Sequence, residues 1–316
     1  MLIKVLDRAT MGEDLNFDIL SPLGELEIYD HSVGEELLSR ISDAEVVVIN
    51  KVKITEAVLQ RAKKLKLICV FATGYDNIDI CAAKARGVAV ANVPAYSTDS
   101  VATFTLATVL SLITHLSTYR TFVASGEYSA SKAPNRITPV YHELSGKTWG
   151  IIGYGNIGKK IAKIAEAFGA RVIVNKRTPV SCAECVDLRQ LCRESDIITV
   201  HCPLNEQTRA LIGEEELSLM KPTAILVNEA RGAVLDEEAV ARAVLDGKIA
   251  AFGSDVYSTE PFSESHPFYA IKAFDNVLLT PHAAWAAYEA RVRCLEIINE
   301  NINAFVSGKI KNRVDI

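Results

Sequence analysis

The stretch KTWGIIGYGNIGKKIAKIAEAFGARVIVNKRT, Lys147 to Thr178, decides the fold. Its apolar run 148–152 has the length of a buried strand, and the glycine-rich turn GYGNIG (153–158) follows directly. Residues 159–168 then carry apolar side chains at helical spacing, and 172–174 reads as a second strand. Strand, glycine turn, helix and strand within about 30 residues is the context that a dinucleotide-binding fingerprint requires.

Each glycine of this turn has a predicted task. Gly153 permits the tight turn, Gly155 lets backbone N–H groups approach a pyrophosphate, and Gly158 lets the helix pack close to the strand. The pyrophosphate would lie at the positive end of the helix dipole. Because the same chain continues with alternating strand and helix patterns, we predict a doubly wound parallel Rossmann sheet of six strands.

The overall composition limits the class of protein. A chain of 316 residues with 49% hydrophobic and 23% charged residues is long enough for two globular domains. Its net charge of -5 gives no basic surface for nucleic acid or anionic membrane. The charged N-terminus is unlike a signal peptide, and the seven cysteines form no regular framework, so we expect reduced thiols in the cytoplasm.

The pattern along the chain predicts a discontinuous organisation. Residues 1 to about 95 alternate strand-like and helix-like segments, which indicates a separate, smaller α/β unit of flavodoxin-like type. A long apolar helix (98–116) and a polar loop (126–146) precede the fingerprint, and a last helix (284–307) is long enough to return to the first unit. We therefore expect a substrate domain of residues 1–95 plus 286–316, with the Rossmann domain, 96–285, inserted into it.

Polar residues follow the predicted strands of the second domain. His201 and Cys202 follow one strand, Glu229 to Arg231 the next, Asp255 and Glu260 the third, and His282 the last. Ligands of a doubly wound sheet bind outside the carboxyl ends of the strands. An arginine, a glutamate and a histidine therefore fall on the side where the cofactor is expected.

Six motifs in order resemble the D-isomer-specific 2-hydroxyacid dehydrogenase family over nearly the whole chain. They are ATGYDNID (72–79), GYGNIG (153–158), HCPL (201–204), NEARG with VLDE (228–237), DVYSTEP (255–261) and TPHAAW (280–285). The segments ELSGKT and PHAAWA are most similar to the glycerate dehydrogenase and hydroxypyruvate reductase branch. The resemblance implies an NAD(P)H-dependent reductase of a small 2-keto acid, hydroxypyruvate or glyoxylate, acting as a homodimer through the helix 98–116.

The resemblance also implies roles for particular residues. His282 corresponds to the general acid/base, Glu260 to the carboxylate that orients it, and Arg231 to the group that binds the substrate carboxylate. The implied cofactor positions are Thr73, Gly153, Gly155, Asn156, Ile157, Gly158, Lys176, Arg177, Cys202, Glu229, Ala230, Asp255, His282 and Ala284. The implied substrate positions are Ala72, Thr73, Gly74, Arg231, His282 and Trp285.

Two positions depart from the family pattern. Where NAD-dependent members carry an acid that accepts from the ribose hydroxyls, this chain has Lys176, followed by Arg177. Cations there would pair with a 2′-phosphate, so we predict that NADP(H) is preferred over NAD(H). Glu229 stands where the family has a small or neutral residue, and the sequence leaves open whether it weakens the grip of Arg231 or faces away.

Other interpretations remain open at this point. Another 2-hydroxy acid, D-lactate or 3-phosphoglycerate, could be the substrate, and corepressors that sense NAD(H) without catalysis resemble the same family. Formate dehydrogenases pair the histidine with a glutamine, which Glu260 disfavours. Cys182 and Cys185 form a CxxC pair without the second pair that a zinc site needs, so no metal is expected. His201 is interpreted as structural.

Overall fold

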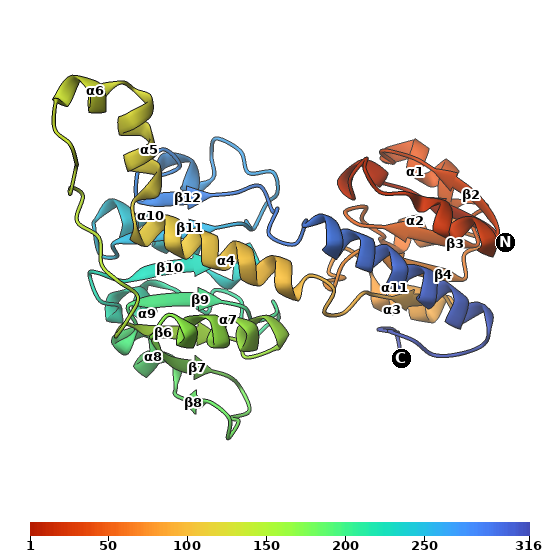
Figure 1. The fold of residues 1–316 in the computed structure, drawn as a ribbon. Coiled ribbons are helices and arrows are strands. Elements are labelled where there is room, and N and C mark those ends of the chain that lie inside the picture. The colour runs from red at the N-terminus through yellow and green to blue at the C-terminus, as the bar shows by residue number, and fades with distance from the viewer. The chain divides into compact units, whose positions relative to one another are not determined.

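A computed structural model describes all residues from 1 to 316, and the chain divides into two compact units. Unit 1 consists of Met1–Ser97 and Ala286–Ile316, and unit 2 of Thr98–Trp285. Both are α/β units built on a parallel sheet (Figure 1). The fold class predicted from the sequence is confirmed.

Unit 1 contains a five-stranded parallel sheet in the order β2-β1-β3-β4-β5. The strands are β1 (Leu2–Val5), β2 (Glu25–Ile28), β3 (Val46–Ile49), β4 (Leu67–Val70) and β5 (Ala89–Ala91). The helices are α1 (Gly34–Ile41), α2 (Glu56–Arg61), α3 (Ile80–Ala85) and α11 (Tyr288–Val306), with short 3₁₀ turns at Arg8–Thr10 and Phe17–Leu23. All residues of β3 and β4 are buried, as expected for strands covered on both faces.

The C-terminal segment is part of unit 1 because it packs and pairs there. Helix α11 packs against β4 and the turn Phe17–Leu23 (Figure 1). Arg291 at its start donates from Nη2 to Asp14 Oδ2 at 2.8 Å. Beyond the helix, Arg313 forms an antiparallel bridge with Ala91, and Val90 N–H donates to Asp315 Oδ1 at 2.8 Å.

Unit 2 contains a seven-stranded parallel sheet in the order β12-β11-β10-β9-β6-β7-β8. The strands are β6 (Thr148–Ile152), β7 (Arg171–Asn175), β8 (Glu184–Cys185), β9 (Ile197–Val200), β10 (Ile225–Asn228), β11 (Ala251–Ser254) and β12 (Val277–Leu279). Counted from β6, this is the Rossmann order 3-2-1-4-5-6 with one further strand, and the order reverses between β6 and β9.

Helices cover both faces of this sheet. Helices α4 (Thr98–Ile113) and α7 (Asn156–Ala167) pack together on one face (Figure 1). On the opposite face, α8 (Leu188–Glu194), α9 (Glu214–Leu219) and α10 (Glu237–Leu245) enclose a second core. The strands alternate between the two cores: in β10, Ile225 and Val227 face α4, whereas Leu226 faces the other core.

Three details of unit 2 differ from the prediction. The sheet has seven strands instead of six, because the short segment β8 at Cys185 pairs with β7. The helix predicted to run from 98 to 116 ends at Ile113, and α5 (Leu116–Ala124) continues at an angle of 65°. His115 takes a left-handed conformation with φ 51°, which an α-helix cannot contain. The predicted loop 126–146 includes a short helix, α6 (Glu127–Ser131).

No single helix has the length and apolar character needed to cross a membrane, and α4 with α5 meets that test only as a bent pair.

We predict that Gly158→Ala destabilises unit 2, whereas Gly155→Ala does not. A Cβ at Gly158 would lie 2.2 Å from the carbonyl oxygen of Gly153, whereas one at Gly155 would meet no atom within 4 Å. Overpacking of this kind costs about 1–3 kcal/mol, so the melting temperature of Gly158→Ala should fall by roughly 5 °C. Equal melting temperatures for the two variants would contradict the packing role of Gly158.

Candidate active site

The carboxyl ends of the strands of unit 2 bring the predicted polar residues to one edge. Gly153, His201, Glu229 and Asp255 each follow directly on the ends of β6, β9, β10 and β11. The strand register pairs Ile152 with Val200, Val200 with Asn228, and Asn228 with Ser254. These four residues therefore occupy neighbouring positions, one step beyond the last paired residues.

The glycine turn between β6 and α7 is as tight as its sequence predicts. Gly153 has φ 95°, and a Cβ there would lie 2.5 Å from the backbone nitrogen of Cys202. Gly158 is buried against the backbone of Gly153, whereas the space around Gly155 is open. Helix α7 begins at Asn156 with no side-chain cap, so its first N–H groups are available to an anion. These features fit a pyrophosphate.

The residues after β7 stand where the ribose of a dinucleotide is expected. Asn175 is fixed, because its carbonyl accepts from Gly153 N at 2.9 Å and its side chain donates to the carbonyl of Val186 at 3.1 Å. Lys176 is half-buried, Arg177 is exposed, and neither forms an ion pair. Both cations can therefore meet a ligand phosphate without first breaking a salt bridge.

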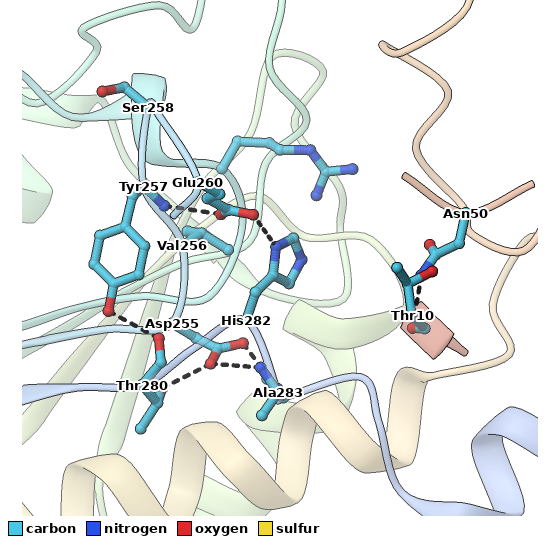
Figure 2. Close-up of polar contacts among 12 residues, drawn as sticks. Thr10, Asn50, Asp255, Val256, Tyr257, Ser258, Glu260, Thr280, His282 and Ala283 are labelled. Atoms are coloured by element: carbon cyan, nitrogen blue, oxygen red, sulfur yellow. Dashed lines mark hydrogen bonds and ion pairs between the residues drawn. The ribbon is translucent and has the colours of Figure 1, made fainter. Parts of the chain in front are cut away.

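His282 and Glu260 form a hydrogen-bonded pair. His282 Nδ1 lies 2.7 Å from Glu260 Oε2, and the other carboxylate oxygen accepts from Tyr257 N–H at 3.0 Å (Figure 2). The side chains are 23% and 30% exposed, so solvent and a small ligand can reach them. With Nδ1 held by the carboxylate, the imidazole is fixed in one orientation and Nε2 is its second proton-carrying nitrogen.

Asp255 fastens the turn that carries His282. Its Oδ1 accepts from Thr280 Oγ1 at 2.6 Å and from Ala283 N–H at 2.8 Å (Figure 2). Its Oδ2 accepts from Ala284 N–H at 2.8 Å. His282 itself has φ 54°, a conformation that costs a non-glycine residue energy. The three bonds from Asp255 offset that cost on both sides of His282. Only a cofactor role was predicted for Asp255 from the sequence, and this structural role was missed.

Arg231 lies on a turn that packs against the segment leading to Glu260. A Cβ on its neighbour Gly232 would lie 2.0 Å from the carbonyl carbon of Tyr257, so only glycine allows this approach. Buried Asn228 holds the turn by donating to the carbonyl of Arg231 at 2.9 Å and accepting from Ala230 N–H at 3.0 Å. Asn228 was not singled out in the sequence, although an amide at the end of a buried strand is a signal for such a role.

Glu229 is almost completely buried and faces α4. Its Oε1 accepts from Thr108 Oγ1 at 3.2 Å, whereas Oε2 has no hydrogen-bond partner. Burial, aided by the negative charge of Asp255, raises the pKa of Glu229 to about 8. Glu229 therefore carries a proton at neutral pH and does not act as an anion beside Arg231. The structure resolves the question that the sequence left open.

His201 is the register neighbour of Glu229. Both of its ring nitrogens are buried and without a partner, and burial lowers the pKa of His201 to about 3. Four side-chain polar atoms in the structure lack a partner in this way, and three of them belong to His201 and Glu229. His201 was interpreted as structural from the sequence, which contains no signal that it lies beside Glu229 with its ring nitrogens unpartnered.

Other predicted site residues lie apart from these groups. Cys202 is buried in the core under α8 to α10, and burial raises the pKa of its thiol to about 11. Ile157 packs against the α4 and α7 core, and Trp285 ends unit 2 half-exposed. Cys182 and Cys185 are free thiols, and no group of three His, Cys, Asp or Glu side chains could hold a metal.

The predicted residues Ala72, Thr73 and Gly74 belong to unit 1 and follow β4. Thr73 Oγ1 donates to the carbonyl of Val93 at 2.8 Å, and Asn92 Nδ2 donates to the carbonyl of Thr73 at 2.7 Å. These bonds hold the backbone of the loop while the side chain of Thr73 stays exposed. The loop is therefore preformed at the carboxyl edge of the unit 1 sheet.

Comparison with known proteins gives the family. Residues 106–284 match the model of the D-isomer specific 2-hydroxyacid dehydrogenase NAD binding domain. The chain is 36% identical to a hydroxypyruvate reductase of Blautia hydrogenotrophica over the full length of both, and 38% identical to a glycerate dehydrogenase of Methylorubrum extorquens over 89% of this chain and 88% of that protein.

A solved structure agrees with these relatives. The D-lactate dehydrogenase of Aquifex aeolicus, solved with NAD and lactic acid, has a TM-score of 0.88 and 30% identity, covering 100% of this chain and 99% of that chain. The chain belongs to the D-isomer specific 2-hydroxyacid dehydrogenase family, and its relatives place it in the branch similar to glycerate dehydrogenase. The family predicted from the motifs is confirmed, and the protein is an oxidoreductase that uses a nicotinamide cofactor.

We predict that Glu229→Gln reduces the loss of stability between pH 5 and pH 8. The folded protein keeps this proton up to a pKa of about 8, whereas the unfolded chain releases it near 4.5. The unfolded state binds fewer protons across that window, so wild-type stability falls as pH rises, by an amount on the order of a few kcal/mol. Thermal melting at both pH values tests this, and an unchanged pH dependence in Glu229→Gln would exclude a proton on Glu229.

Proposed function

We propose that the protein reduces a small 2-keto acid, hydroxypyruvate or glyoxylate, to the D-2-hydroxy acid with NAD(P)H. The observation that carries this proposal is the His282–Glu260 pair, 2.7 Å apart, at the carboxyl edge of a Rossmann sheet. The names of its relatives, which include hydroxypyruvate reductase, glyoxylate reductase and glycerate dehydrogenase, support the substrate class. The reverse reaction would be that of a D-glycerate dehydrogenase.

The two units would divide the work. We propose unit 2 as the dinucleotide-binding domain, with backbone N–H groups at Gly155 to Gly158 holding the pyrophosphate and Asp255 standing near the nicotinamide. Unit 1 would be the substrate domain, with the loop Ala72 to Gly74 offering backbone N–H groups to the substrate carboxylate. The fixed backbone of that loop supports this assignment.

The chemistry of the keto group assigns the polar side chains. The reduced nicotinamide supplies a hydride when bound. His282 then gives its proton to the keto oxygen, and Glu260 keeps the imidazole oriented through the Nδ1 contact. Arg231 binds the carboxylate of the substrate and polarises the keto oxygen, tasks that suit its planar guanidinium.

We predict that His282→Gln lowers kcat, whereas Arg231→Gln lowers kcat and raises KM. The first change removes a proton donor used in the transition state, which is worth about 10²–10⁴-fold in rate. The second also removes binding of the substrate carboxylate. Steady-state assays with hydroxypyruvate and NADPH measure both effects. The exposed residue His31 gives the control variant His31→Gln, and near-normal kcat in His282→Gln would refute the mechanism.

We further propose that NADP(H) is preferred over NAD(H). Lys176 and Arg177 follow the second strand of the fingerprint without ion-pair partners, and a 2′-phosphate supplies the charge that they lack. One structural neighbour, an acyclic imino acid reductase with 30% identity and a TM-score of 0.86, was solved with NADPH, and the Aquifex aeolicus enzyme was solved with NAD. The neighbours alone therefore leave the choice open.

We predict that Lys176→Asp shifts the preference toward NADH. The variant replaces an attractive charge with one that repels the 2′-phosphate and can accept from ribose hydroxyls, so the ratio of kcat/KM for NADPH over NADH should fall by at least about tenfold. Lys159→Asp, on the exposed surface of α7, serves as a charge-matched control. A wild-type protein with a strong NADH preference would end this proposal.

We also propose a homodimer. Helix α5 and the segment after α6 expose several large apolar side chains, including Leu116, Val123, Ile137, Val140 and Tyr141. Leu116, Ile137, Val140 and Tyr141 line one hollow, and a cluster of exposed apolar side chains of this kind is typical of an interaction site. The sequence predicted that the contact is made by the helix 98–116, whose N-terminal part, α4, buries six of its sixteen residues within unit 2. A monomeric mass in light scattering would contradict the dimer.

We expect the protein to work in the reducing cytoplasm. All seven cysteines are free, and two of them, Cys81 and Cys182, are exposed. Exposed thiols of this kind persist where glutathione keeps them reduced. Cell fractionation that finds the protein in an oxidising compartment would contradict this expectation.

A further inference from the structure

Gly153, His201, Glu229 and Asp255 form a row at the carboxyl edge of the unit 2 sheet. Two neighbours in this row, His201 and Glu229, have side-chain atoms without hydrogen-bond partners. His201 and Glu229 follow strands whose last residues, Val200 and Asn228, are paired in register. Both side chains lie on the α4 face, because Thr199 and Val227, two residues earlier, face the same core. Buried polar atoms without partners are costly, so a site that keeps three of them is expected to have a use.

The surroundings of Glu229 keep its carboxyl group protonated. The carboxyl group of Asp255, at the end of the next strand, accepts three hydrogen bonds, and its negative charge contributes to raising the pKa of Glu229. His201 on the other side is held neutral by burial, and α4 contributes only the hydroxyl of Thr108. Tyr257, whose hydroxyl donates to the carbonyl of Thr280 at 2.8 Å, also stays neutral because burial raises its pKa.

A positive charge placed near Asp255 would favour loss of the proton from the Glu229 carboxyl group. In the proposed reaction the keto oxygen lies within hydrogen-bond reach of His282, and the hydride donor lies about 3–3.5 Å from the keto carbon. The nicotinamide would then lie near the turn 282–284 that Asp255 holds, and only the oxidised ring is positively charged. A unit charge on the order of 10 Å from Glu229, at an effective dielectric constant near 20, would favour the Glu229 anion by roughly tenfold.

We propose that Glu229 is a proton-releasing residue that couples the oxidation state of the bound cofactor to pH. This inference rests on the proposed function. On binding of the oxidised cofactor the Glu229 O–H bond breaks, the proton passes to the buffer, and the charge of the ring stabilises the carboxylate that remains; no electron moves. Binding of the neutral, reduced ring leaves the proton in place. By linkage, the preference for the oxidised over the reduced cofactor rises with pH.

Proton release on cofactor binding tests the proposal without turnover. Calorimetric titrations with NADP⁺ and NADPH at pH 7.5, in two buffers of different ionisation enthalpy, give the number of protons released. The number of protons released with NADPH is subtracted from the number released with NADP⁺. The difference excludes protons released by groups that contact the phosphates, because both cofactors carry the same phosphates. Since His282 also lies near the ring, the titrations use His282→Gln as the background. We expect about half a proton released with NADP⁺ in this background, and none once Glu229→Gln is added.

The controls separate the possible results. Glu237 is a second buried glutamate, bonded to Ser258 and His266, and Glu237→Gln in the same background should keep the release. Equal release with and without Glu229→Gln would overturn the proposal. A protein that binds neither cofactor would contradict the proposed function as well, whereas one that binds both without release dependent on Glu229 would contradict this inference alone.

A second measurement does not depend on the folding of the Glu229→Gln variant. Infrared difference spectra of the His282→Gln protein should show the carbonyl band of a protonated carboxyl group losing more than half of its intensity when NADP⁺ is added at pH 7.5, and keeping it when NADPH is added. Loss of the band with both cofactors, or with neither, would overturn the proposal.

Discussion

The three hydrogen bonds that Asp255 accepts from Thr280, Ala283 and Ala284 hold the site of this protein together. They join the end of β11 to the turn after β12 and keep His282 in a left-handed conformation that a free chain would avoid. With this turn fixed, Nδ1 of His282 meets Glu260, and the packing of Gly232 against Tyr257 brings the Arg231 turn to the same segment. The chemistry proposed for the keto group depends on that arrangement.

Most of the fold could be predicted because each element is marked by local patterns. The glycine turn of the fingerprint and the apolar strands place β6 and the strands that follow within one residue of their observed bounds, whereas the helix period at 159–168 places the start of α7 three residues late. Two features had weaker signals. Strand β8 is only two residues long and exists because Cys185 reaches the edge of β7. The break between α4 and α5 depends on His115, whose left-handed conformation the surrounding apolar sequence did not reveal.

The meeting of two predicted site residues followed from residue type and strand position, since His282 and Glu260 come after neighbouring strands and their side chains lie 2.7 Å apart. The rest of the site was harder to predict. The site could not be predicted where the proposed function depends on a buried side chain having no hydrogen-bond partner. Nothing in the sequence shows that Glu229 is buried against Thr108 with one oxygen unpaired, or that His201 beside it has no hydrogen-bond partner. Those properties come from the strand register and the covering helix, which pattern alone does not supply.

The account holds that the side chains His282, Glu260 and Arg231 act with a nicotinamide on a single keto group. Its most direct test is the reduction of hydroxypyruvate by NADPH that carries deuterium at the transferred position, followed by NMR and chiral analysis of the product. The account predicts D-glycerate with one deuterium on the former keto carbon. Product of the opposite configuration, product without deuterium, or no turnover of any 2-keto acid with either cofactor would contradict it.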